Sequence, residues 1–221
     1  MRLNKFIALS SGLSRRAADD AVYRNRVLVN GRAPTAGQQI TTADTVTLDG
    51  TPITPPVNTI TIMLNKPVGY VCSRDGQGSK TVYNLLPLEL HVLKPVGRLD
   101  KDSSGLLLLT NDGELAQQLT HPRYQKTKVY EIQLDKALQP LHRQMINDHG
   151  ITLPDGRSQL GLERLRDGNE TGWRVTMREG RNRQIRRTFE SLGYKITALH
   201  RSGFGTFSLG SLPSGEFITV S

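Results

Sequence analysis

The stretch VGRLDKDSSGLLLLTNDG, residues 96–113, places four consecutive leucines between a polar turn and an Asn-Asp-Gly sequence. A short apolar run bounded on both sides by turn-forming residues is typical of a buried strand. The sequence therefore predicts a strand near residues 106–110 in the core of a domain. The acidic and serine-rich residues before this strand, among them Asp100 and Asp102, need an explanation of their own.

Three interpretations of these polar residues compete. Asp100 and Asp102 stand at positions 1 and 3 of a calcium-binding loop, but position 12 would be Asn111, where a bidentate glutamate is needed. The polar residues can instead cap the turn by accepting hydrogen bonds from backbone N–H groups. In the third interpretation one carboxylate is catalytic, held by a rigid turn at the start of a strand and flanked by Arg98. The residues alone do not decide between a cap and a catalytic group.

Strand and helix patterns alternate along the chain after residue 59. The predicted strands lie near residues 60–65, 69–73, 106–110, 128–134, 172–178, 195–201 and 216–220, and the predicted helices span residues 80–86, 113–120, 138–148 and 182–192. These helices are too few to separate the strands of a doubly wound parallel sheet. We therefore predict an α+β fold whose larger domain has a mixed, largely antiparallel sheet flanked by helices.

A smaller unit precedes this region. Two short helical patterns are separated by Gly12, a helix stop, and Ser14, a helix N-cap, and the dipeptide Asn30-Gly31 predicts a tight turn. Three prolines follow within residues 51–58 and predict a linker. The predicted organisation is a helix-hairpin domain over residues 1–50, a linker over 51–58 and a second domain over 59–221.

The charge of the chain points to a polyanionic partner. The 221 residues carry a formal net charge of +9, and residues 1–32 hold seven basic side chains against two acidic ones. Nucleic acid is the first candidate partner. An anionic membrane surface competes with it, but the basic residues do not lie along a long amphipathic helix. No apolar stretch has the length of a signal peptide or a membrane span, so we expect a cytoplasmic protein.

Cysteine and histidine usage argues against several kinds of site. Cys72 is the single cysteine, which excludes an intrachain disulfide and a CxxC motif. The five histidines are scattered without an acidic partner at ligand spacing, so no metal is expected. No glycine-rich loop has a nucleotide-binding form, so no cofactor is expected either.

Four motifs together resemble one enzyme family. GRLDKDSSGLLLLTNDGELAQQLTHP, KTKVYEIQL, EGRNRQIRRTFESLGYKITALHR and LNKPVGYVCS are similar in order and spacing to the pseudouridine synthases that modify uridines of the small and large ribosomal subunits. Residues 1–50 resemble the small RNA-binding domain of ribosomal protein S-four, which is often appended to these enzymes. The resemblance covers nearly the whole chain and implies an isomerase that converts uridine in ribosomal RNA to pseudouridine.

The resemblance also implies the residues of the active site. Asp100 matches the catalytic aspartate, and Arg98 matches an arginine that fills the space left in the RNA by the flipped uridine. Tyr130 matches a tyrosine that stacks on the target base. Arg186 matches the basic residue that ion-pairs with the aspartate, and Leu199 matches an apolar residue of the base pocket.

Basic residues in both parts of the chain are expected to contact the RNA backbone. Six arginines lie between Trp173 and Thr188, a density that suits bidentate phosphate binding. The predicted RNA-binding residues are Arg2, Lys5, Arg15, Arg16, Arg32, Arg181, Arg183 and Arg187. The expected partner is ribosomal RNA or an assembling ribosomal subunit, bound by a monomer that needs no membrane and no cofactor.

Some alternatives stay open. The ending SGFGTFSLGSLPSGEF and the EGRNRQIRR motif look slightly closer to enzymes of the large subunit, which favours 23S over 16S RNA. An RNA-binding assembly factor without catalysis is a second hypothesis, and a hydrolase that uses Asp100 and Asp102 as paired carboxylates is a third.

Overall fold

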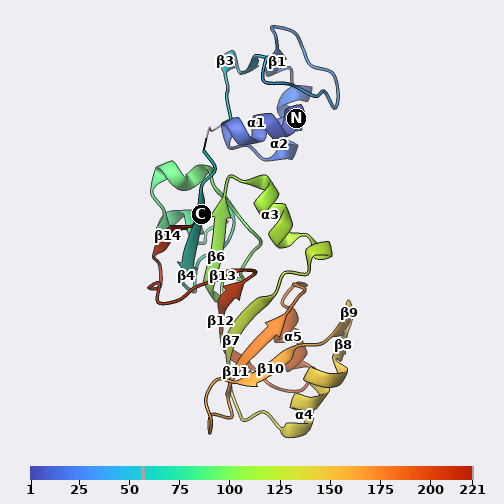
Figure 1. The fold of residues 1–221 in the computed structure, drawn as a ribbon, viewed down its shortest axis with the longest axis vertical. Coiled ribbons are helices and arrows are strands. Elements are labelled where there is room, and N and C mark those ends of the chain that lie inside the picture. Colours follow the sequence, from blue (N-terminus) through green and yellow to red (C-terminus); the bar gives the residue numbers. More distant parts are fainter. Residues whose placement is uncertain (56–57, 221) are drawn as a thin grey trace. The chain divides into compact units, whose positions relative to one another are not determined.

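The computed structural model describes residues 1–55 and 58–220 and divides into two compact units, Met1–Thr59 and Ile60–Ser221 (Figure 1). Residues 56–57 of the predicted linker lie outside the described part. The linker prediction also covered Thr51–Pro52, which form a short strand that pairs with the strand before it. Proline is tolerated there because this strand is at the edge of its sheet.

The first unit consists of two helices and a three-stranded sheet. Its elements are α1 (Leu3–Ser11), α2 (Arg15–Tyr23), β1 (Val27–Val29), β2 (Val46–Leu48) and β3 (Thr51–Pro52). The predicted helix ends are confirmed: Gly12 follows α1 with a φ of 75°, and the Ser14 hydroxyl accepts a hydrogen bond from the Ala17 amide. Leu3, Ile7 and Ala18 pack with apolar residues of β1 and β2 in a core of this unit's own.

The second unit contains all the elements after residue 59. These are β4 (Thr61–Lys66), η1 (Val82–Leu85), η2 (Leu88–Val92), β5 (Lys94–Pro95), β6 (Ser104–Thr110), α3 (Gly113–Thr120), η3 (Pro122–Tyr124), β7 (Lys128–Leu134), α4 (Pro140–Gln144), η4 (Met145–His149), β8 (Ile151–Leu153), β9 (Gly156–Ser158), β10 (Gly161–Arg164), β11 (Gly172–Met177), α5 (Gln184–Glu190), β12 (Ile196–Phe204), β13 (Phe207–Ser208) and β14 (Phe217–Val220).

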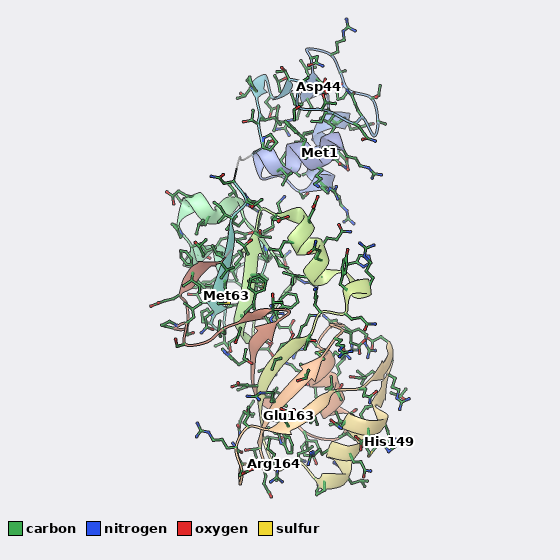
Figure 2. All side chains as sticks on the ribbon, viewed as in Figure 1. Met1, Asp44, Met63, His149, Glu163 and Arg164 are labelled. Atoms are coloured by element: carbon green, nitrogen blue, oxygen red, sulfur yellow. The ribbon has the colours of Figure 1, made fainter. Side chains whose placement is uncertain are left out.

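One mixed sheet organises the second unit. Its strands follow the order β10-β11-β7-β12-β6-β4-β14, and every neighbouring pair is antiparallel except β12 and β6. Glu163 and Arg164 lie on the edge strand β10, and Met63 lies on β4 near the other edge (Figure 2). The prediction of an α+β fold with a mixed, largely antiparallel sheet is confirmed.

The four leucines of the opening stretch lie on β6 and are all fully buried. Leu107 and Leu109 belong to one core cluster, whereas Leu106 and Leu108 belong to another. Side chains alternate between the two faces of a strand, so both faces of the sheet are covered here. Helix α5 contributes to the first cluster and helix α3 to the second. A continuous apolar run is the expected pattern for a strand buried on both faces.

Other predictions for the second unit are wrong in detail. Residues 69–73 form a turn with an isolated bridge between Val71 and Thr81 instead of a strand. The long predicted helix over 138–148 is a short α4 that continues into a π turn, η4. Strands β8, β9 and β10 were not predicted, because residues 151–164 carry several charged and glycine residues and no apolar run.

Candidate active site

The residue Asp100 lies in the turn that leads into β6, and its side chain is 38% exposed. The turn closes through a hydrogen bond from the Ser103 amide to the Asp100 carbonyl oxygen, 3.1 Å long. Leu99 is buried immediately before it, with its backbone against the Cys72 thiol. The carboxylate therefore emerges from a turn whose two sides are fixed in the core.

A buried lysine holds this turn from the protein side. Lys66, at the end of β4, is fully buried and donates from its Nζ to the carbonyl oxygens of Pro67, Asp100 and Ser103, at 3.0, 3.1 and 2.6 Å. Burial lowers the pKa of Lys66, although the carboxylates of Asp100 and Asp102 act in the opposite direction. Three backbone acceptors satisfy the three ammonium hydrogens, which fixes the path of the chain around Asp100.

Asp100 and Asp102 share one arginine. A guanidinium nitrogen of Arg183 lies 3.4 Å from the Asp100 carboxylate and 3.2 Å from the Asp102 carboxylate. Partial burial would raise the pKa of Asp102, but hydrogen bonding to Arg183 and the charges of Arg186 and Arg183 lower it overall. The hydrogen bond to Asp102 raises the pKa of Arg183 in turn.

The expected ion pair between Arg186 and Asp100 is not formed, and Arg183 pairs with Asp100 instead. Arg186 is buried on helix α5 and donates to the carbonyl oxygens of Ile196 and Asp102, at 3.1 and 2.9 Å. Its ion pair is with the Asp102 carboxylate, at 3.3 Å. Because two carbonyl oxygens fix its guanidinium, Arg186 braces the far side of the turn, and Arg183 is the arginine that reaches Asp100.

A cleft of about 1170 Å³ brings together the five residues implied by the resemblance. Arg98, Asp100, Tyr130, Arg186 and Leu199 all line it. Tyr130 projects from β7 and is 8% exposed, and Leu199 projects from the neighbouring β12 with the same exposed fraction. Arg98 is exposed.

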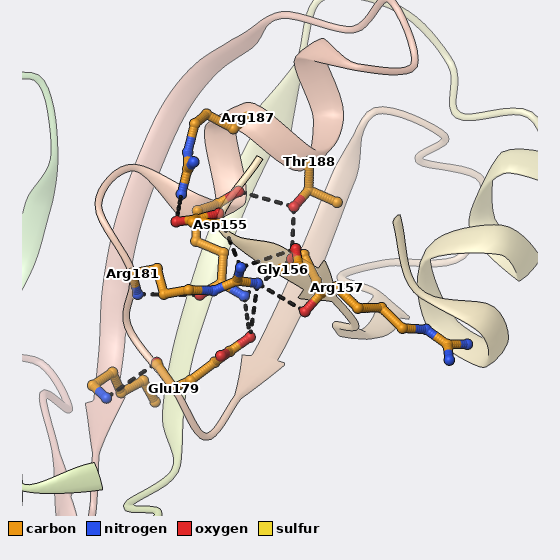
Figure 3. A network of polar contacts seen from close by, with 10 residues as sticks. Asp155, Gly156, Arg157, Glu179, Arg181, Arg187 and Thr188 are labelled. Carbon is orange, nitrogen blue, oxygen red and sulfur yellow. Dashed lines mark hydrogen bonds and ion pairs between the residues drawn. The ribbon is translucent and has the colours of Figure 1, made fainter. Parts of the chain in front are cut away.

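Two of the arginines expected to bind RNA are engaged within the protein (Figure 3). Arg181 and Arg187 both pair with the carboxylate of Asp155, at 2.9 and 2.7 Å. Arg181 also donates to the carbonyl oxygens of Gly156 and Arg157. The turn between β8 and β9 supplies Asp155, and this hairpin was absent from the sequence prediction. Both guanidinium groups thus fasten the hairpin to the arginine-rich segment, whereas Arg183 turns to the acidic pair.

The basic residues predicted to bind RNA in the first unit lie on its surface. Arg2, Arg15, Arg16 and Arg32 are exposed, and Lys5 is half-buried. Other basic side chains of this unit form internal pairs, Arg24 with Asp20 and Arg26 with Asp49.

Lys128 and Arg201 are among the further cations that line the cleft and were missed in the sequence. Lys128 lies two residues before Tyr130 on β7, and Arg201 lies two residues after Leu199 on β12. The period of two along a strand was the available signal, because residues two apart share a face. Within residues 1–55 and 58–220, no cluster of histidine, cysteine or acidic side chains could hold a metal ion. No helix in the same ranges is long and apolar enough to cross a membrane.

Comparisons with known proteins agree on one family. The family model described as RNA pseudouridylate synthase matches residues 60–191. The chain is 34% identical to the ribosomal large subunit pseudouridine synthase B of Bacillus subtilis, over 97% of this chain and 90% of that protein. It is 33% identical to the dual-specificity RNA pseudouridine synthase RluF of Escherichia coli strain K12, over 98% of this chain and 74% of that protein. A crystal structure of a pseudouridylate synthase has a TM-score of 0.72 and 32% identity, covering 100% of this chain and 96% of the other.

Proposed function

The chain belongs to the RNA pseudouridylate synthase family and is a pseudouridine synthase, and we propose that it isomerises a specific uridine of ribosomal RNA with Asp100 as the nucleophile. Membership of this family argues against the two other hypotheses drawn from the sequence, a non-catalytic RNA-binding factor and a hydrolase with paired carboxylates. The observation that carries the proposal is the position of Asp100, which is partly exposed at the cleft that Tyr130 and Leu199 line.

The reaction requires the target base to leave the RNA helix. The bond between the base nitrogen and the anomeric carbon breaks, the base rotates, and carbon 5 of uracil joins the anomeric carbon. Carbon 5 loses a proton and the freed nitrogen gains one, so the product is an isomer of the substrate and no co-reactant is consumed. A base inside a duplex has no room to rotate, so it must be flipped into the cleft.

The residues of the cleft supply distinct parts of this process. Asp100 attacks as a carboxylate, at either the anomeric carbon or the pyrimidine ring, and forms a covalent intermediate. Arg183 pairs with the carboxylates of Asp100 and Asp102 and holds them in place while the RNA displaces water. The ring of Tyr130 stacks on the flipped base, and Leu199 contacts its edge. Arg98, exposed at the rim, enters the helix in place of the uridine.

The names of the relatives support ribosomal RNA as the substrate and favour the large subunit. The Bacillus subtilis relative is named for the large ribosomal subunit. Its similarity extends over 97% of this chain and so includes the first unit. We propose residues 1–50 as an S-four-like RNA-binding domain that presents its exposed arginines to structured RNA, residues 51–58 as a linker and residues 59–221 as the catalytic domain. Asp20 and Asp49 engage two of its arginines, and Arg2, Arg15, Arg16 and Arg32 are exposed for phosphates.

Tritium release tests the proposal directly. Transcripts of 23S and 16S RNA labelled with tritium at carbon 5 of uracil should release tritium with this protein, one equivalent for each modified uridine. Pseudouridine mapping in a strain that lacks the gene should show the loss of a site in 23S RNA. Release from 16S RNA alone would overturn the large-subunit assignment, and release from neither transcript would overturn the ribosomal substrate.

A further inference from the structure

Lys128 and Arg201 are cations of the cleft that have no place in the mechanism above. Lys128 lies on β7 and Arg201 on the neighbouring β12, and both line the cleft. Both also lie close to one aromatic ring: the Lys128 nitrogen is 5.5 Å, and the central carbon of the Arg201 guanidinium 5.0 Å, from the centroid of Phe204. Phe204 is 1% exposed and also lines the cleft, so both charges lie beside the same buried ring at the cleft wall.

The Arg201 side chain is buried and only partly satisfied. It is 2% exposed, and its Nε donates to the carbonyl oxygen of Leu106 at 2.8 Å. One of its terminal nitrogens is buried without a hydrogen-bond partner. Buried guanidinium donors in proteins are nearly always hydrogen-bonded. Arg201 lines the cleft, so an anion bound there would offer this guanidinium the acceptor that it lacks.

Among the described residues, the Lys128 ammonium group also has no carboxylate beside it. Its Nζ donates to the carbonyl oxygen of Glu179 at 3.2 Å, whereas the Glu179 carboxylate turns to Arg181 and Gln184. Burial lowers the pKa of Lys128, and the charge of Arg201 lowers it further. In the described ranges, neither Lys128 nor Arg201 forms an ion pair with a carboxylate.

The carboxylates near the cleft are already balanced. Asp100 and Asp102 pair with Arg183, and Asp102 also pairs with Arg186. Two partly desolvated positive charges side by side are unfavourable unless an anion joins them. The anion that an RNA substrate brings into the cleft is its phosphodiester backbone.

The backbone of β12 places this pair beside the catalytic turn. The turn of Asp100 runs directly into β6, where Gly105 pairs with Arg201. Gly105 has a φ of 103°, and a Cβ there would lie 2.3 Å from the Arg201 carbonyl oxygen, so only glycine permits this approach. We propose that Lys128 and Arg201 form a phosphodiester site for the RNA strand that carries the target uridine. This inference deepens the proposed function and rests on it, since it takes RNA as the substrate.

Binding of octauridylate, a short single-stranded RNA, tests the site without reference to the modified position. The full-length protein and its variants Lys128→Gln and Arg201→Gln are titrated with this RNA over a range of salt concentrations. Each variant should raise the Kd about tenfold at low salt, because a charge-assisted contact is lost. Each should also reduce the slope of log Kd against log salt by about 0.7, the value for one phosphate contact on a single strand.

Lys195→Gln is the matched control, since Lys195 is exposed in the same unit and is not among the residues that line the cleft. It should leave the Kd and the salt slope unchanged. Unchanged binding and slope in a folded Lys128→Gln variant overturns the site, and this holds even if Arg201→Gln fails to fold. A loss of tritium release in that variant with normal octauridylate binding also overturns it, because the lysine would then serve the chemistry. If the wild type shows these slopes but releases no tritium from ribosomal RNA, the phosphodiester site stands and the proposed substrate falls.

Discussion

The ammonium nitrogen of Lys66 lies 3.1 Å from the backbone oxygen of Asp100, although the two residues are far apart in the sequence. Lys66 is fully buried and reaches the carbonyl oxygens on both sides of the turn, those of Asp100 and Ser103. The position of the Asp100 carboxylate thus depends on a side chain that lies beneath the turn and lines no part of the cleft.

Replacing Lys66 should therefore impair catalysis through the geometry of the turn. Lys66→Met keeps the volume of the side chain and leaves three carbonyl oxygens without their donor. Small displacements of a reacting group are costly, so we expect single-turnover tritium release to fall about 100-fold. The control is Asn65→Leu, which removes a partly buried hydrogen bond to Leu212 from the adjacent residue. Equal losses of rate in the two variants would mean that general destabilisation, and not the turn, causes the effect.

The proposed nucleophile is tested by Asp100→Asn. This nearly isosteric change should abolish tritium release while RNA affinity stays within a few-fold of wild type, because the loss of one negative charge does not weaken phosphate binding. Asp102→Asn is the matched control, since Asp102 shares Arg183 with Asp100 and belongs to the same turn. We expect this control to retain most of its rate. Activity of Asp100→Asn within about tenfold of wild type would refute the assignment.

The role of Tyr130 separates into its ring and its hydroxyl. Tyr130→Phe keeps the stacking face and should fold normally, so any large loss of rate belongs to the hydroxyl. Tyr130→Ala also removes the stacking, which is worth about 1–3 kcal/mol per base. Rates and thermal stability are measured for both variants, because Tyr130 is 8% exposed and its truncation leaves a cavity. Wild-type rates in both would place the tyrosine in the core without a catalytic function.

Much of the secondary structure of both units was predictable because its signals are local. The four leucines marked β6, and the alternation of β7 and the Gly12 and Ser14 helix ends were equally clear. Tertiary pairing is a different matter. In the sequence, Lys66 looks like an ordinary residue at the end of a strand. Its burial depends on the turn around Asp100, which lies much later in the chain.

The arginine-rich segment shows the same limit. Charge density indicated phosphate contacts for Arg181 and Arg187, but Asp155 pairs with both in the structure. Asp155 belongs to a hairpin without an apolar run, which no period of two or 3.6 residues reveals. Arg183, and not Arg186, is the partner of Asp100. Arg183 lies in the turn before α5, whereas Arg186 lies within α5 and donates to two backbone carbonyl oxygens.

Stability should depend on pH through His200. Its Nδ1 lies 2.9 Å from the Ser104 hydroxyl, and burial lowers its pKa although Glu131 opposes this shift. The unfolded chain takes up a proton near pH 6.5, whereas folded His200 remains neutral to lower pH. The free energy of unfolding should therefore fall as the pH drops below about 6.5. Urea unfolding of wild type and His200→Gln from pH 7.5 to 5 should show a steeper decline for wild type, and parallel curves would contradict the prediction.

The two units make separable contributions if residues 1–50 recognise structured RNA. Each unit has its own apolar core, so a variant that begins at residue 60 should fold without the first unit. It loses the exposed Arg2, Arg15, Arg16 and Arg32 and with them a share of the phosphate contacts. Fewer contacts release fewer counterions, so RNA affinity should fall and its salt dependence should become shallower.

Catalysis by the shortened protein should persist, because the Asp100 turn, the cleft and the arginines beside it all lie in the second unit. We expect slow tritium release from a minimal RNA, with the loss falling on the apparent affinity more than on the maximal rate. Single-turnover rates measured against enzyme concentration at two salt concentrations separate these two terms. Equal affinity and an equal salt slope for the two proteins would show that the basic helices are an ordinary solvated surface. A large loss of the maximal rate with unchanged affinity would instead give the first unit a part in assembling the catalytic turn.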